Sequence, residues 1–148
     1  MGLISPDVRD FLHNQKLGYV ATVSVGNLPN LSPKGTIFGL DDHTLVFADI
    51  RSPDTMKNIK HNPSVEINVI DPLLRKGYLF RGEAKILKEG KQYDDILNHY
   101  RLSGVKNPIK GIVLVDITSM EDVISPLYDL GLTENEIKSR WQKHLQQL

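Results

Sequence analysis

The chain has 148 residues, and its 18 lysines and arginines balance its 18 aspartates and glutamates, so the formal net charge is zero. This balance argues against general nucleic-acid binding, which needs a basic excess. The absence of cysteine excludes disulfides, thiolate metal sites and a cysteine nucleophile. No apolar stretch approaches the roughly 20 residues that cross a bilayer, and the N-terminus lacks the apolar segment of a secretory signal. We therefore expect one cytoplasmic domain over residues 1–148, without membrane or nucleic-acid partners.

The first half of the chain is expected to form one helix and three strands. Ser5-Pro6-Asp7 supplies an N-cap, a proline suited to the first turn and an acidic residue, and it predicts a helix that ends near Gly18. β-branched and alternating residues then predict strands at 18–25, 30–40 and 44–48.

The second half repeats the helix-start pattern and adds three more strands. Ser52-Pro53-Asp54 predicts a short helix that Asn62-Pro63 ends. The remaining strands are expected at 65–69, 78–87 and 112–118, with a bulge at Gly82. Further helices are expected at 91–100 and at about 133–147, the last opening with a capping box. Six strands with short turns and few helices predict a small antiparallel barrel.

Residues 48–63 gather basic side chains around the second predicted helix start. A helix N-terminus offers unpaired N–H groups and a partial positive charge, so phosphate binds there readily. Arg51 can hold a phosphate through two parallel hydrogen bonds, Ser52 and Thr55 add hydroxyl groups, and Lys57 lies one turn further on. The alternative is that Ser52 only caps the helix, Asp54 complements the helix dipole and the basic side chains are solvated.

The predicted strand at 30–40 has an unusual interior. Pro33 and Gly35 weaken strand pairing and indicate an irregular edge where a ligand approaches the backbone. A bulge alone would explain these two residues, but it would not require Ser32, Lys34 and Thr36 beside them. This stretch therefore favours the anion-site interpretation of residues 48–63.

Side chains for independent catalysis are not evident in the sequence. The five histidines lack the spacing of a metal site along a helix, and each is expected to be a surface or turn residue. No nucleophile with its base is recognisable, so we expect no metal site and no catalytic side chain. Redox or group-transfer chemistry would have to come from a cofactor.

Four stretches together carry a family resemblance between Val8 and Ile124: GYVATVSVGNLPNLSPKGT, TLVFADIRSPDTMKNIKHNPSVEINV, GYLFRGEAKIL and GIVLVDITSMEDV. In order and spacing they resemble the pyridoxamine 5′-phosphate oxidase-like family of FMN-binding split barrels. The resemblance implies a mainly β, α+β fold: a six-stranded antiparallel split β-barrel with Greek-key order and short peripheral helices. It also implies a homodimer with FMN at the subunit interface.

The resemblance further assigns cofactor-binding residues by position. Those that would line the ring edge of FMN are Ser32, Pro33, Lys34, Gly35 and Thr36. Those that would follow the ribityl chain are Asp49, Ile50 and Arg51, and those that would face the phosphate are Ser52, Thr55 and Lys57.

Two departures from the family pattern argue against oxidation of pyridoxamine phosphate. Ser52 is followed by Pro53-Asp54 where the oxidases usually have an Arg-Lys pair, and SRWQKHLQQL stands where they have an Arg-x-Leu-x-Pro motif. We expect an FMN-dependent oxidoreductase with an unidentified small-molecule substrate or electron donor. The alternatives are a flavin carrier or electron-transfer protein, or a split barrel that uses F420 or haem. Trp141 is expected to pack in the core or a dimer interface.

Overall fold

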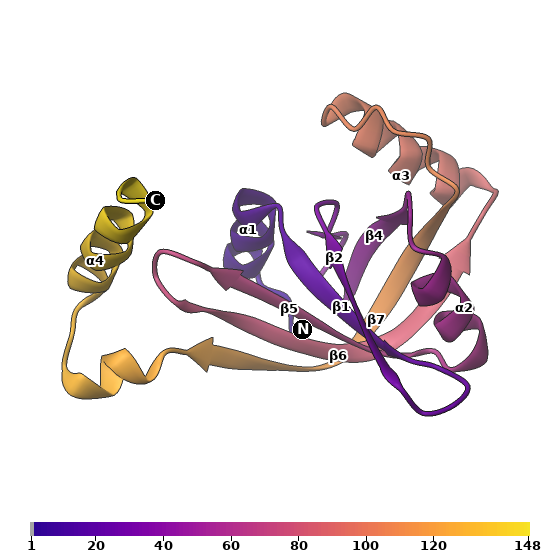
Figure 1. Cartoon of the computed structure of the whole chain (residues 1–148). Helices are drawn as coiled ribbons and strands as arrows, with labels where there is room; N and C mark the ends of the chain where they lie inside the picture. The colour runs from indigo at the N-terminus through magenta and orange to yellow at the C-terminus, as the bar shows by residue number, and fades with distance from the viewer. Residues whose placement is uncertain (1) are drawn as a thin grey trace.

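The computed structural model describes residues 2–148, which form seven strands, four α-helices and a 3-10 turn (Figure 1). In chain order the elements are α1 (Pro6–Gln15), β1 (Gly18–Val23), β2 (Pro29–Lys34), β3 (Phe38–Gly39), β4 (Thr44–Asp49), α2 (Pro53–His61), β5 (Ser64–Asp71), β6 (Lys76–Leu87), α3 (Lys91–Leu102), β7 (Gly111–Ile124), η1 (Pro126–Leu130) and α4 (Glu134–Gln146). None of the helices in the described part of the chain is long and apolar enough to cross a membrane.

All strands pair antiparallel in one sheet, in the order β2-β1-β5-β6-β7-β4-β3. The sheet has seven strands, so the prediction of six was wrong. The stretch expected as one strand at 30–40 is divided at Gly35–Ile37, and its two parts pair with different neighbours: β2 with β1, and β3 with β4. Proline and glycine weaken pairing at this point, as the sequence indicates, but the result is a break and not a bulge.

The break at Gly35–Ile37 explains why the sheet curls. β2 and β3 are opposite edges of the sheet, yet only three residues separate them. Four Cα–Cα steps of about 3.8 Å span at most about 15 Å. In a flat seven-stranded sheet the edges would lie about 29 Å apart, at about 4.8 Å for each strand spacing. The connection therefore requires a strongly curled sheet, and Figure 1 shows the resulting half-barrel.

Gly82 lies at the bulge that the sequence predicts. The register of β6 against β7 shifts between Arg81 and Gly82. A Cβ atom on Gly82 would lie 2.2 Å from the backbone oxygen of Asp116, so only glycine permits this approach of the two strands.

Two hydrophobic clusters hold the sheet and helices together. The larger one fills the inside of the curl, where Val8 and Leu12 of α1 meet core residues such as Phe47 and Phe80. The second cluster joins α3 to β4 and β7. Ile37 belongs to the larger cluster and its neighbour Phe38 packs against the second, so the Gly35–Ile37 crossing lies where the two clusters meet.

The C-terminal helix α4 lies beyond the turn between β5 and β6, well away from α2 and α3 (Figure 1). Its predicted capping box is confirmed, because Glu136 N–H donates to Thr133 Oγ1 at 3.2 Å and Thr133 N–H donates to Glu136 Oε1 at 3.4 Å. The Trp141 ring packs beneath the Arg75 guanidinium, whose carbon lies 3.6 Å from the ring centroid. Among the described residues, Trp141 belongs to neither hydrophobic cluster. The expectation that it packs in the core was therefore wrong.

Candidate functional site

A cavity lies where the end of β2 meets the connection from β4 to α2. It encloses about 190 Å³. The predicted residues that line it are Pro33, Lys34, Gly35, Thr36, Ile50, Arg51 and Ser52, together with Ala48. The structure therefore brings the two stretches that the sequence singled out, 32–36 and 49–52, to one place.

Lys34 is the central cation of this cavity. Its side chain is buried, with 7 % exposed, and its ammonium donates to Ser32 Oγ at 2.7 Å and to Ser52 Oγ. An ammonium group has three N–H donors, so one remains for a ligand. Burial lowers the pKa of Lys34 below its ordinary value, and the negative charge of Asp49 partly offsets this effect.

Ser52 does not cap α2, although its sequence pattern predicts a cap. The same Ser-Pro-Asp pattern opens α1, where Ser5 Oγ accepts the N–H of Val8 at 3.3 Å. Ser52 occupies the N-cap position of α2, but its hydroxyl bonds to Lys34 and caps no backbone N–H. The first turn of α2 thus keeps the unpaired N–H groups that bind anions.

Asp49 supplies an unusual buried acceptor close to Lys34. Only 8 % of the residue is exposed, and its Oδ1 has no hydrogen-bond partner. An unsatisfied buried polar atom costs about 1–3 kcal/mol. Asp49 is not among the residues that line the cavity, and its negative charge acts on the Lys34 ammonium.

Other predicted residues lie outside the cavity wall. Ser32 is half-buried and reaches the site only through Lys34. Thr55 is buried in α2, at 1 % exposed, and does not line the cavity. Lys57 is exposed and lines a separate hollow with Asp54 and residues of the β1–β2 turn. Arg51, by contrast, lines the cavity, although it is exposed.

The bond between Lys34 and Ser52 was missed by sequence reasoning, which placed Lys34 at one end of the cofactor and Ser52 at the other. No local signal predicts it, because it joins residues on β2 and before α2 that become neighbours only when the sheet curls. Each histidine was expected to be a surface or turn residue, and no sequence pattern indicated that His13 and His99 line a common cavity.

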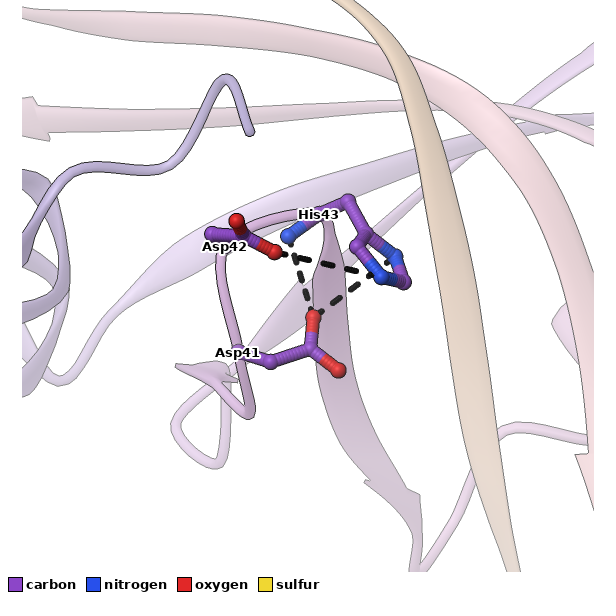
Figure 2. Close-up of side chains that lie close together, drawn as sticks. All are labelled: Asp41, Asp42 and His43. Carbon is purple, nitrogen blue, oxygen red and sulfur yellow. Dashed lines mark hydrogen bonds and ion pairs between the residues drawn. The ribbon is translucent and has the colours of Figure 1, made fainter. Parts of the chain in front are cut away.

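An acidic turn carries a second cluster of titratable groups (Figure 2). His43 Nδ1 lies 3.6 Å from Asp41 Oδ1, and His43 Nε2 lies 3.9 Å from Asp42 Oδ1. Asp41 Oδ1 also accepts the backbone N–H of His43 at 3.0 Å. These contacts account for the arrangement as a hydrogen-bonded turn before β4.

The structure is thus an α+β fold with a curled antiparallel sheet, and a basic cavity lies at one of its strand-to-helix junctions. Residues 4–121 match the family model described as pyridoxamine 5′-phosphate oxidase. The chain belongs to this family, which confirms the resemblance seen in the sequence. A search of curated proteins finds no match to the chain.

Solved structures share the fold. HupZ of Group A Streptococcus, in a tagged form, is 29 % identical with a TM-score of 0.74, covering 82 % of this chain and 95 % of HupZ. An FMN-binding protein of Syntrophomonas wolfei is 19 % identical with a TM-score of 0.68, covering 80 % of this chain and 84 % of that protein. A protein named F420 reductase is 24 % identical with a TM-score of 0.60, covering 76 % of this chain and 94 % of its own.

Proposed function

We propose that this protein binds FMN and is a flavin-dependent oxidoreductase that does not oxidise pyridoxamine phosphate. The observation that carries the proposal is the buried Lys34 ammonium, which retains a free N–H beside the uncapped start of α2. The family match supports a flavin, and two structural neighbours are named for FMN and for F420. A bound flavin would supply the hydride or electron transfer that no side chain here provides.

The phosphate of FMN fits the charges of this cavity. A phosphomonoester carries a charge near −2 at neutral pH, and Lys34 and Arg51 supply two positive charges at the cavity. Ser52 accepts a hydrogen bond from Lys34, so its hydroxyl hydrogen is free to donate to a phosphate oxygen. The N–H groups of the first turn of α2 complete the set. The sequence placed Lys34 against the flavin ring, but its bond to Ser52 favours a position at the phosphate.

Asp49 acts on this site through its charge. It is not among the residues that line the cavity, and its Oδ1 is buried from solvent. Its negative charge acts on the Lys34 ammonium. The phosphate of F420 is a diester with a single negative charge. The two cations at the cavity therefore favour the phosphomonoester of FMN over that diester.

A homodimer belongs to the proposal because the cavity is too small for a whole flavin. Its volume of about 190 Å³ lies below the usual range of cofactor sites, about 300–1,000 Å³. It accommodates the phosphate and ribityl chain, and the ring needs a further cover. Tyr19 and Leu31, on neighbouring strands next to the site, are 42 % and 66 % exposed. An apolar surface of this kind suits a second copy of the chain, with each copy covering the other's flavin ring.

The test is the visible spectrum of the purified protein, followed by titration with FMN and with riboflavin. Riboflavin has the same ring and ribityl chain but no phosphate, so we expect its affinity to be at least about tenfold lower. Mass analysis of the released cofactor identifies it. A colourless protein that binds neither compound would refute the flavin site, and bound F420 or haem would overturn the choice of FMN.

The enzymatic part of the proposal needs a separate measurement. Turnover of a reduced nicotinamide by the FMN-loaded protein in air, with release of oxidised nicotinamide and reduction of O2 to hydrogen peroxide, would support an oxidoreductase. Stoichiometric reduction of the flavin by small reductants without any turnover would support the alternative of a flavin carrier or electron-transfer protein. Gel filtration at several protein concentrations tests the dimer.

A further inference from the structure

A second cavity lies on the other side of the Gly35–Ile37 crossing. It encloses about 280 Å³ between the C-terminal ends of α1 and α3. Gly35 and Thr36 line both this cavity and the proposed flavin site. The two hollows are therefore neighbours separated by one stretch of backbone.

Aromatic rings form one wall of the second cavity. The His99 ring lies against Phe38, with centroids 4.3 Å apart and planes tilted by 33°. Tyr100 meets Phe38 edge-on at 5.4 Å, and its hydroxyl donates to the backbone oxygen of Thr36 at 2.9 Å. Burial raises the pKa of Tyr100, so its phenol stays neutral and keeps this bond. The wall is fixed in place and offers ring faces for stacking.

The described side chains that line this cavity include basic groups but no acidic ones. Its titratable side chains include Lys16, His13 and His99, and no carboxylate is among its lining residues in the described chain. This imbalance is local, because the chain as a whole has a net charge of zero. Basic residues in the last turns of α1 and α3 complement the helix dipoles. The dipoles explain the residue types, but they do not explain an open hollow with an aromatic wall between the two helix ends.

We propose that this cavity binds a small planar aromatic anion, with the ring against the Phe38–His99 wall and the negative charge toward Lys16 and His13. The cavity is slightly smaller than usual drug-sized pockets, so it suits one or two fused rings. The cavity adjoins the part of the proposed flavin site that would hold the phosphate and ribityl chain, so the anion is a separate ligand and not the substrate of the flavin ring. Its binding does not rest on the proposed function.

Benzoate is the probe for this site, and benzamide is its uncharged control of the same shape. Ligand-observed and protein-observed NMR on the full chain should detect benzoate with a dissociation constant of about 1 mM. The shifted resonances should include those of His99, Tyr100 and Val105. Benzamide should bind at least about threefold more weakly. Equal binding of both compounds, or no binding of benzoate, would overturn the proposal.

Matched variants locate the site. Lys16→Met should weaken benzoate binding about threefold to fivefold, and His99→Ala should weaken it about fivefold through the lost ring face. Both side chains are exposed, so the variants should fold. Lys60→Met and His61→Ala remove the same residue types at the exposed end of α2, outside this cavity, and should leave binding unchanged. If the α2 variants weakened benzoate binding as much as the cavity variants, benzoate would not be bound in this cavity.

The same titration on protein loaded with FMN separates this proposal from the proposed function. Because Gly35 and Thr36 line both cavities, FMN and benzoate should each shift the backbone resonances of these two residues, and Lys16→Met should reduce only the shift caused by benzoate. If FMN does not bind but benzoate still shifts the His99 resonance, the flavin proposal fails and the anion site stands. If FMN binds and benzoate does not, the anion site fails alone.

Discussion

Replacing Lys34 by methionine tests the proposed site most directly. Methionine has a similar length, so it fills the space of the lysine stem without the ammonium. The variant loses two hydrogen bonds from a charged donor, each about 1.5–3 kcal/mol. It also removes the desolvation penalty of a buried charge, which is several kcal/mol. The lowered pKa of Lys34 shows that burial already disfavours the charged form despite Asp49. The two effects should nearly cancel, and the free energy of unfolding without ligand should change by about 1 kcal/mol or less.

FMN binding should respond very differently. Loss of one charge-assisted hydrogen bond to the phosphate corresponds to an affinity decrease of about 10-fold to 150-fold. Urea denaturation of the unliganded protein measures the stability, and quenching of flavin fluorescence measures the affinity. Lys57→Met is the matched control, because Lys57 lines a separate hollow and its loss should leave both quantities unchanged.

Riboflavin distinguishes the two positions considered for Lys34. If the ammonium contacts the phosphate, Lys34→Met should weaken FMN binding and leave riboflavin binding unchanged. If it contacts the ring, as the family resemblance implied, the affinities for both compounds should fall together. A variant that loses several kcal/mol of stability while it binds FMN normally would refute the reasoning, since Lys34 would then be a structural link between β2 and α2.

Other predictions concern ligand charge, backbone packing and a buried phenol. FMN affinity should fall about threefold to tenfold between pH 7.5 and pH 5.5, because the phosphate loses a charge near pH 6, and titration at the two pH values checks this. Gly82→Ala should lower the free energy of unfolding by about 2 kcal/mol or more, because its Cβ would meet the backbone of β7. Gly26→Ala is the control, since its Cβ would have no contact closer than 3.9 Å. It should change the free energy of unfolding by less than about 0.5 kcal/mol in the same urea denaturation assay. Tyr100 has a raised pKa in the folded protein, so its contribution to stability is complete below about pH 10 and decreases above that pH. The wild type should therefore lose more stability between about pH 9 and pH 11 than Tyr100→Phe. An equal loss in the two proteins would contradict this prediction.

Local chemistry made much of the fold predictable. The Ser-Pro-Asp pattern marks the starts of both α1 and α2, but the predicted serine cap forms only on α1. The capping box gives the start of α4, because it depends on residues close in sequence. The bulge at Gly82 was also predictable, since glycine inside a strand marks close backbone approach. The division between β2 and β3 was not, because it is decided by which distant strand each part pairs with.

The candidate site was predictable only as a set of residues. Residues 33–36 and 50–52 of the two predicted stretches do line one cavity, but the partner of each side chain depends on tertiary structure. Ser5 and Ser52 stand in the same local pattern and use their hydroxyls differently, because only Ser52 has a buried lysine in reach. The second cavity had no sequence signal at all, since it joins the ends of two helices far apart in the chain.

The Gly35–Ile37 crossing links these observations. It joins the two edges of the sheet, and for this reason it cannot pair as a regular strand. Thr36 holds it in place, because its hydroxyl accepts the backbone N–H of Ala48 at 3.0 Å and its carbonyl accepts the Tyr100 hydroxyl at 2.9 Å. Backbone that is fixed but free of ladder pairing can contact ligands on both sides, which is why a cavity lies against each face of this segment.

Thr36→Val removes the hydrogen bond between the Thr36 hydroxyl and the Ala48 N–H but keeps the shape of the side chain. The backbone N–H of Ala48 would lose its partner in a buried strand, at a cost of about 1–3 kcal/mol in the free energy of unfolding. If the crossing positions both cavities, the variant should weaken FMN and benzoate together, even though the Thr36 hydroxyl is used by Ala48 and not by either ligand. Thr118→Val, an exposed threonine on β7, is the control. Weakened FMN binding with unchanged benzoate binding would show that the two cavities are independent, and that the crossing is only a connection between strands.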